Sequence, residues 1–183
     1  MSSFVLPGKR IVVVGTTGCG KTTLADRLAA SLGYPHTELD SLYWGPGWTP
    51  APDFQERAVR AAEGECWVFD GNYRRLLEEN VWPLADTVVW LDYSLPTILW
   101  RLARRTLRRV VYDEELWNGN HEGVRDQLFS SESLFLYACQ THRPRRERYA
   151  SIFSDPRWTH LRLFRLLTPR QTSRWLEFVA SQQ

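Results

Sequence analysis

The sequence has little cysteine, no excess of charge of either sign and no long hydrophobic run. Its three cysteines, Cys19, Cys66 and Cys139, are far apart and form no CxxC or Cys/His ligand pattern, which argues against a disulfide framework and a structural zinc site. No apolar stretch approaches a membrane span, and the segment MSSFVLPGKR lacks the apolar core of a signal peptide. We therefore expect a cytoplasmic protein with no membrane partner.

Lysine is also scarce, since Lys9 and Lys21 are the only lysines and every other basic residue is arginine. Genome composition alone can cause such a bias, but it makes Lys21 conspicuous. The formal net charge of +2 provides no strong field toward nucleic acid, which is therefore a possible but not a favoured partner. A length of 183 residues with 43% apolar content suits one domain, residues 1–183.

Short apolar runs alternate with helical patterns along the chain. The runs predict strands at residues 11–14, 37–39, 66–69, 87–91 and 158–164. Helices are predicted at residues 21–32, from a proline at 50 or 52 to about 63, from 95 onward and from 169 onward; residues 111–150 are predicted as a loop through 118–120 followed by one or two helices. This alternation predicts a three-layer αβα fold with a central parallel sheet of about five strands.

The clearest pattern in the chain is G-x-x-x-x-G-K-[ST], between a predicted buried strand and a predicted helix. It consists of Gly15, Thr16, Thr17, Gly18, Cys19, Gly20, Lys21 and Thr22. Glycines let backbone N–H groups converge on phosphate oxygens, and the helix N-terminus adds positive potential. We expect these residues and Thr23 to bind ATP, with Lys21 on the terminal phosphates, Thr22 on Mg²⁺ and Cys19 as a small filler rather than a redox sensor.

Such a phosphate loop serves several classes of protein, and the absences in the chain narrow the choice. No lysine follows residue 21, so the [NT]-K-x-D motif with which GTPases read guanine cannot occur, and no D-x-x-G switch motif is present. The chain is short for a paired-domain motor ATPase and carries no LSGGQ-like signature. Two classes remain: a small phosphoryl-transfer enzyme and an ATP-dependent regulator.

The segment Asp70-Gly71-Asn72-Tyr73-Arg74 follows a predicted buried strand. Here the chain resembles the nucleotide-kinase superfamily typified by adenylate kinase, whose members carry Asp-Gly-aromatic-Pro-Arg. Asp70, Gly71 and Arg74 match that pattern, whereas Asn72 and Tyr73 depart from it. The resemblance implies that Asp70 holds the Mg²⁺ shell through water and that Arg74 contacts transferred or acceptor phosphate. From the residues alone, capping of a turn is the less favoured alternative for Asp70.

Arginines spaced R-x-x-x-R follow the fourth predicted strand and resemble the lid helix of the same superfamily. The resemblance implies that Arg101 lies near adenine and Arg105 on phosphates, within a helical lid that extends over about residues 110–150. The alternative is a solvated basic face, which we favour for Arg104 and Arg108. The cluster at residues 142–146, His-Arg-Pro-Arg-Arg, is a further source of arginines for the γ-phosphate.

A closer resemblance covers nearly the whole chain. Its features are the phosphate loop, a Gly-Tyr-Pro then Glu-Leu-Asp segment, Trp-Gly-Pro-Gly-Trp and the segments WVFDGNY, DTVVWLDYSLP, RRTLRR and LWNGN. Together they resemble the adenylate-kinase-related proteins called DNA topology modulation proteins. That name records a genetic effect and establishes no chemical activity. The resemblance therefore implies the fold and ATP binding but no particular substrate, and it leaves open a regulator that acts on nucleic acid without small-molecule transfer.

Asp40 follows the second predicted strand, where superfamily members that phosphorylate small hydroxyl compounds carry an acid. A hydroxyl acceptor must lose a proton, so Asp40 suits a base or orienting group, although it can also cap a turn. Trp44 and Trp48 lie in a predicted acceptor-side insertion at about residues 40–64, either as flat walls of a pocket or as core under a proline-rich loop. His36 and His121 are expected to be structural or surface residues.

These features predict an ATP- and Mg²⁺-dependent kinase of a small molecule such as a nucleoside, a nucleotide or a related metabolite. Lys21, Asp40, Arg74 and Arg105 are its candidate catalytic residues. Thr22 and Asp70 are its candidate metal ligands.

Overall fold

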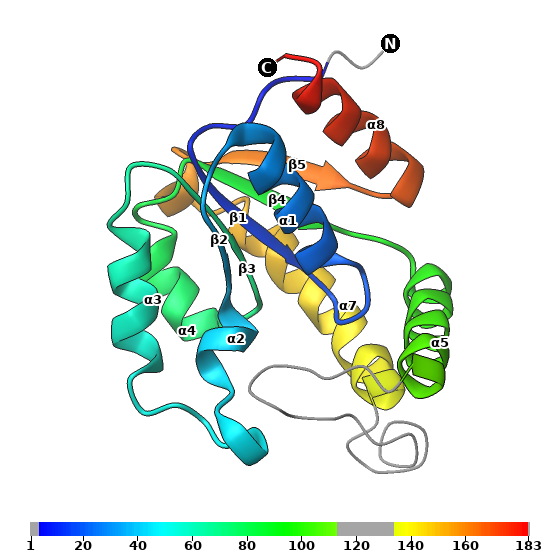
Figure 1. Ribbon diagram of the computed structural model, residues 1–183. Coiled ribbons are helices and arrows are strands. Elements are labelled where there is room, and N and C mark those ends of the chain that lie inside the picture. The colour runs from blue at the N-terminus through cyan, green and yellow to red at the C-terminus, as the bar shows by residue number, and fades with distance from the viewer. Residues whose placement is uncertain (1–3, 113–133, 183) are drawn as a thin grey trace.

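The computed structural model describes residues 4–112 and 134–182, and in these ranges five parallel strands form one sheet (Figure 1). The strands are β1 Arg10–Gly15, β2 His36–Glu38, β3 Trp67–Asp70, β4 Thr87–Leu91 and β5 Arg162–Leu166. Their order across the sheet is β2-β3-β1-β4-β5, which places the first strand in the centre. The predicted parallel sheet of about five strands is confirmed.

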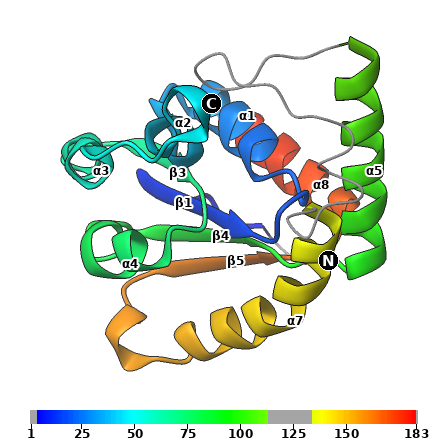
Figure 2. The ribbon, with the colours of Figure 1, turned by 90° about the horizontal axis from the view of Figure 1, so that it is seen from below.

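Helices connect the strands and cover both faces of the sheet. They are α1 Lys21–Leu32, α2 Leu39–Tyr43, α3 Phe54–Ala62, α4 Arg74–Leu76, α5 Leu95–Tyr112, α7 Leu134–Ile152 and α8 Pro169–Ala180, with the 3₁₀ turns η1 Pro46–Trp48 and η4 Pro156–Trp158 and the π-helical segment η2 Leu77–Val81. Figure 2 shows α1 and α8 on one side of the sheet and α4 and α7 on the other. No helix within 4–112 or 134–182 is long and apolar enough to cross a membrane.

The central strand shows why two helical layers form. Ile11 and Val13 pack with α1, α5 and α8, whereas Val12 and Val14 pack with α3, α4 and α7. All four side chains are fully buried. Because successive side chains of a strand point to opposite faces, a continuous β-branched run can fill two cores at once. The three-layer interpretation of this run is therefore confirmed.

The predicted strand at 158–164 was wrong in its boundaries, because β5 begins only at Arg162. Pro156 opens a 3₁₀ turn at this point, and the side chain of Asp155 accepts a hydrogen bond from the backbone N–H of Arg157 at 3.0 Å. Trp158 then packs edge-on against Trp82, with ring centroids 5.3 Å apart. Packing of this aromatic residue overrides its strand propensity.

The bounds of three further elements also differ from the prediction. The helix expected from Pro50 or Pro52 begins at Phe54, and the hydroxyl group of Thr49 does not cap it but donates to the carbonyl of Pro46 at 2.8 Å. The strand expected at 37–39 comprises residues 36–38, and the residue after it opens α2. The strand expected at 66–69 comprises 67–70.

The helix predicted at 21–32 and the start of the helix predicted from 169 are confirmed. Gly33 ends α1 with φ 70°, and Thr168 caps α8 by accepting from the N–H of Gln171 at 3.1 Å. The predicted loop at 118–120, His121 and much of the predicted lid lie outside the described residues, while α7 supplies a helix after that loop. The division into one domain with an acceptor-side insertion stays a prediction.

Candidate active site

The phosphate loop connects β1 to α1 and turns on glycines in the left-handed region. Gly18 has φ 82° and Gly20 has φ 94°, values that side-chain-bearing residues rarely adopt. A Cβ atom at Gly18 would lie 2.4 Å from Cγ of Leu102, and one at Gly20 would lie 2.6 Å from Nη1 of Arg101. Both glycines are therefore favoured by their backbone conformation, and Gly18 is also required by space, which lets α5 approach the loop closely.

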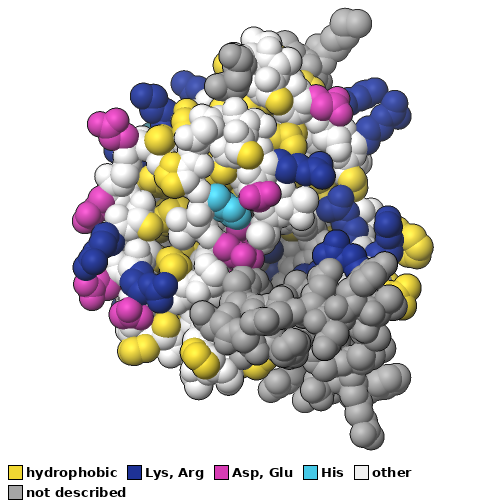
Figure 3. Space-filling view, viewed as in Figure 1, with side chains coloured by type: hydrophobic (Ala, Val, Ile, Leu, Met, Phe, Trp, Pro, Cys, Tyr) yellow, Lys and Arg dark blue, Asp and Glu magenta, His cyan; other side chains and the backbone are white. Residues whose placement is uncertain are grey.

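An oxygen-rich cluster lies at the carboxyl ends of β2 and β3. Glu38 and Asp70 are register partners in these parallel strands. The hydroxyl group of Thr22, in the first turn of α1, lies 3.0 Å from Oε1 of Glu38 and 3.0 Å from Oδ1 of Asp70. Figure 3 shows acidic side chains and a histidine at the centre of this face, across from a group of basic side chains.

The cluster fits a magnesium ion that is bound together with a nucleotide. No group of three or more His, Cys, Asp and Glu side chains in the described ranges is arranged to hold a metal by itself. Mg²⁺ does not need one, since it usually keeps several waters and binds through one or two carboxylates and the phosphates of a substrate. The hydroxyl of Thr22 and the two carboxylates supply oxygen ligands of the required kind.

His36 supports this cluster from β2. Its Nε2 lies 2.8 Å from Oδ2 of Asp70, so the second carboxylate oxygen remains directed at Thr22. Burial lowers the pKa of His36, but the hydrogen bond and the charge of Asp70 outweigh that effect and raise the pKa above its ordinary value. The expectation that His36 is merely a structural or surface residue thus misses its contact with a candidate metal ligand.

Asp40 lies in the first turn of α2 and does not act as the helix cap, a position that Glu38 occupies. Its Oδ1 accepts a hydrogen bond from the hydroxyl group of Tyr73 at 2.7 Å. Burial and the neighbouring charge of Asp40 raise the pKa of Tyr73, so the phenol stays protonated and remains a donor. The ring of Tyr73 packs against Tyr43 and Phe54, with centroid distances of 4.9 and 4.8 Å. Asp40 is therefore a carboxylate oriented by a rigid aromatic cluster.

Trp44 and Trp48 are half-buried, so they are neither core residues nor fully exposed surface residues. Their rings meet edge to face, with centroids 5.6 Å apart. The turn between them is closed by a hydrogen bond from the N–H of Gly45 to the carbonyl of Thr49 at 2.7 Å. Trp48 has φ 57°, the only positive φ of a non-glycine residue in the described ranges. Such strain concentrates at functional sites, because surrounding structure must enforce it.

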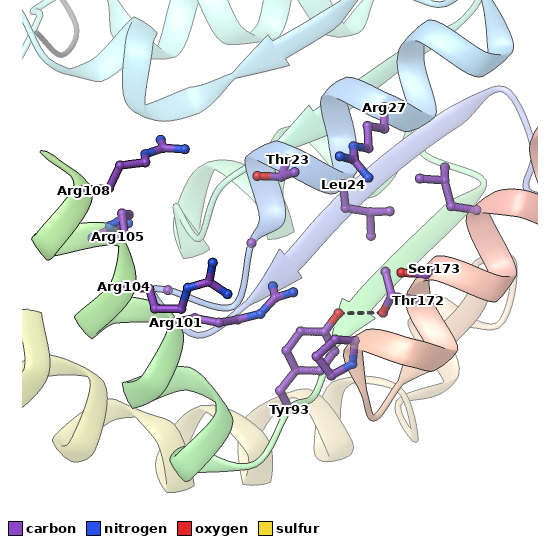
Figure 4. A pocket seen from close by; sticks show the side chains of 14 residues that line it. Thr23, Leu24, Arg27, Tyr93, Arg101, Arg104, Arg105, Arg108, Thr172 and Ser173 are labelled. Carbon is purple, nitrogen blue, oxygen red and sulfur yellow. Dashed lines mark hydrogen bonds between the residues drawn. The ribbon is translucent and has the colours of Figure 1, made fainter. Parts of the chain in front are cut away.

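A cavity of about 530 Å³ lies beside the phosphate loop, between α1, α5 and α8 (Figure 4). Arg101 donates from Nη1 to the carbonyl of Cys19 at 2.6 Å and lies 5.2 Å from the ring centre of Tyr93. Arg105 also lines this cavity. So do Arg104 and Arg108, which we expected on a solvated face; both are exposed and yet contribute to the cavity wall.

The arginine cluster at 142–146 does not act as a unit, because its side chains leave α7 in different directions. His142 forms a hydrogen bond with the carbonyl of Tyr93 at 2.9 Å, Arg143 pairs with Glu147, and Arg146 pairs with Asp92.

Arg145 is half-buried, and its positive charge acts on the pKa of the Cys19 thiol in the phosphate loop. Its buried Nη1 has no hydrogen-bond partner within the described part of the chain. Among these arginines, Arg145 is the best placed for a phosphate.

Arg74, expected to contact a transferred or acceptor phosphate, pairs with a carboxylate in this structure. It lies on α4 with 67% of its side chain exposed, and its Nε contacts Glu78 at 3.3 Å. The same carboxylate accepts a hydrogen bond from Arg148 of α7 at 2.6 Å. These contacts link α4 to α7, and the role of Arg74 on phosphate stays a prediction.

Cys19 should resist alkylation in the folded protein. Its side chain is buried, and burial raises the pKa of its thiol despite the neighbouring charges of Lys21, Arg101 and Arg145. Reaction requires an accessible thiolate, so we expect iodoacetamide to modify the exposed Cys139 first, the half-buried Cys66 more slowly and Cys19 only after unfolding. Peptide mass spectrometry over time measures this order. Early modification of Cys19 would contradict the filler interpretation.

The sequence interpretation missed Glu38, the role of His36, and Asn72. His36 and Glu38 stand at alternate positions of β2, so their side chains lie on one face of the strand. A strand of only three residues gives a weak periodic signal in the sequence. Asn72 stood out only as a departure from the superfamily pattern. Its side chain bonds the backbone of Gly15 at the start of the phosphate loop.

The chain is similar in sequence to shikimate kinases of Synechococcus elongatus and Nostoc punctiforme, although no protein-family model matches it. The shikimate kinase of Synechococcus elongatus is 33% identical over 113 residues, which cover 53% of this chain and 59% of that protein. The chain thus spans less than two thirds of that relative. The shikimate kinase of Nostoc punctiforme is 28% identical over 157 residues, or 73% of this chain and 83% of that protein.

Solved structures show the same architecture at low sequence identity. Shikimate kinase from Acinetobacter baumannii, in complex with shikimate, has a TM-score of 0.54 at 17% identity and covers 98% of this chain and 96% of its own. Deoxyadenosine kinase from M. mycoides, with bound dATP, has a TM-score of 0.54 at 14% identity and covers 94% of this chain and 97% of its own. The chain therefore has the three-layer αβα fold of the P-loop kinases.

Proposed function

We propose that this protein is a kinase that transfers the γ-phosphoryl group of ATP, in the presence of Mg²⁺, to a hydroxyl group of a small molecule. One observation carries the proposal. The phosphate loop, the Thr22–Asp70 oxygen cluster and the oriented carboxylate of Asp40 follow directly from the ends of three neighbouring strands, β1, β3 and β2. Ligands of open α/β sheets bind at this edge.

On the donor side, backbone N–H groups of the loop and Lys21 hold the phosphates. Arg101, fixed on Cys19 and Tyr93, faces the base and ribose in the cavity, while Arg105 and Arg145 neutralise phosphate charge. Thr22, Asp70 and Glu38 would hold Mg²⁺, which when bound supplies positive charge to the phosphate oxygens.

On the acceptor side, Asp40 accepts the proton of the attacking hydroxyl group, and Tyr73 keeps the carboxylate in place through its 2.7 Å hydrogen bond. Trp44 and Trp48 provide flat walls that suit a ring-shaped metabolite or a nucleoside. The relatives support a small-molecule acceptor, since the names of those proteins specify shikimate and deoxyadenosine as their substrates. Arg74 is retained as a candidate contact for an acceptor phosphate.

A regulator that acts on nucleic acid, the alternative raised by the resemblance to DNA topology modulation proteins, gains no specific support. The similar proteins reported above are small-molecule kinases. The net charge of +2 also provides little attraction for a polyanion. We therefore do not propose it as a second function.

An acceptor screen tests the proposal. Purified protein with ATP and Mg²⁺ is incubated with nucleosides, nucleoside monophosphates, shikimate and polyols, and ADP is measured by a coupled assay. We expect ADP formation that depends on a particular acceptor and disappears when EDTA removes Mg²⁺. The same low rate with and without every acceptor would contradict a small-molecule kinase.

A further inference from the structure

The side chain of Asn72 connects the phosphate loop to α7. Its Nδ2 donates to the carbonyl of Gly15 at 2.8 Å, and its Oδ1 lies 3.4 Å from the N–H of the same glycine. The hydroxyl group of Tyr149, on α7, donates to that Oδ1 at 3.1 Å. One amide thus contacts both backbone groups at the entry to the loop and a side chain that is 77 residues away in sequence.

The donors and acceptors around Asn72 allow only one orientation of its side-chain amide. Oδ1 faces two donors and Nδ2 faces an acceptor, so a flipped amide would set its NH₂ group against the N–H of Gly15. Tyr149 is 3% exposed, and burial raises its pKa to about 12, so its hydroxyl group stays protonated. Buried polar groups that satisfy one another in this way define a single geometry.

Tyr149 shares a face of α7 with Arg145, because residues four apart lie one helical turn apart. Ala138 and His142 belong to the same inward stripe. The hydrogen bond between Tyr149 and Asn72 therefore also fixes the distance of Arg145 from the phosphate loop. Nη2 of Arg145 donates to the hydroxyl group of Tyr137 at 3.1 Å, whereas its buried Nη1 has no hydrogen-bond partner in the described ranges and is the donor left for an anion on that side of the loop.

We propose that Asn72 is a positioning residue that sets the spacing between the phosphate loop and α7, so that a γ-phosphate contacts both at once. The inference rests on the proposed function, since it requires a nucleoside triphosphate in the loop. It assigns a role to a position at which this chain departs from the nucleotide-kinase pattern. ADP, which lacks the γ-phosphate, contacts the loop but does not need this spacing.

Tyr149→Phe removes one hydroxyl group and retains the ring. Isothermal titration with a non-hydrolysable ATP analogue and with ADP measures its effect. We expect the affinity for the analogue to fall about three- to tenfold, the range of one neutral hydrogen bond, and the affinity for ADP to change less than twofold. Asn72→Ala, which removes the contacts to Gly15 and Tyr149 without adding a charge, should show the same selectivity if Tyr149→Phe does not fold.

Arg145→Gln distinguishes positioning from simple support of the fold. If Tyr149 acts by placing Arg145, the double variant Arg145→Gln/Tyr149→Phe should bind the analogue as weakly as Arg145→Gln alone, because coupled residues are not additive. Asn80→Ala, at a residue that accepts a surface hydrogen bond from Gln55, is the matched control and should bind both nucleotides normally. Equal losses for ADP and the analogue, or full additivity, would overturn the inference alone. Failure of the unaltered protein to bind any nucleotide would overturn the proposed function as well.

Discussion

Lys21→Ala should lower kcat/KM for acceptor phosphorylation by roughly 10²–10³-fold, the usual loss when one preorganised charge-stabilising group is removed. Lys21 follows the left-handed turn at Gly20 and opens α1, and we propose that its ammonium group contacts the phosphates bound in the loop. The affinity for the ATP analogue should fall as well, and titration of both quantities measures the effect.

The chain offers a matched control, because its only other lysine is Lys9. Lys9 is exposed before β1, and its contact with Asp86 is made by its backbone N–H and not by its side chain. Lys9→Ala should therefore retain normal kinetics and stability. If Lys21→Ala and Lys9→Ala behaved alike, the phosphate loop would not be the site of the reaction.

Asp40→Asn should lower kcat by roughly 10²–10⁴-fold with little change in the KM for ATP, because general base catalysis contributes about that factor. The amide retains the shape of the side chain and can still accept from Tyr73, so the aromatic cluster should remain intact. Steady-state kinetics at saturating acceptor separates the loss in kcat from any loss in binding.

Two further variants define the role of Asp40. Tyr73→Phe removes the orienting hydrogen bond but retains the carboxylate, so we expect a smaller loss in kcat than for Asp40→Asn. Asp53→Asn changes a carboxylate that is exposed and paired with Arg57, and it should have no effect. If Asp40→Asn stayed within a few-fold of the unaltered enzyme, the acceptor would not require a base, as is the case for a nucleoside monophosphate.

Local features of the chain were predictable wherever neighbouring residues determine them. The run 11–14 is β-branched throughout, which predicts a strand buried on both faces, and all four side chains are buried. The glycines of residues 15–20 permit the left-handed turns of the phosphate loop, and Gly33 and Thr168 mark helix ends. In each case the controlling interaction lies within a few residues, so the pattern alone carries the information.

Boundaries and pairings that depend on distant parts of the chain were not predictable. Tryptophan is a residue type that favours strands, but Trp158 packs on Trp82 and lies in a 3₁₀ turn. The arginines at 142–146 read as one cluster, yet successive helical positions are turned by about 100° and therefore reach different partners. Only the neighbouring elements decide which arginine faces the phosphate loop.

The sequence by itself predicted the parallel sheet and the phosphate loop, because the first follows from short apolar runs that alternate with helical patterns and the second from glycines at a fixed spacing before Lys21. The roles of Lys21, Thr22 and Asp70 stay predictions. Tertiary structure alone decided that Glu38 joins Asp70, that Tyr73 orients Asp40 and that Tyr149 reaches Asn72. The physical reason is strand order: β2, β3 and β1 become neighbours only when the sheet forms, and their carboxyl ends then bring side chains from distant segments to one edge.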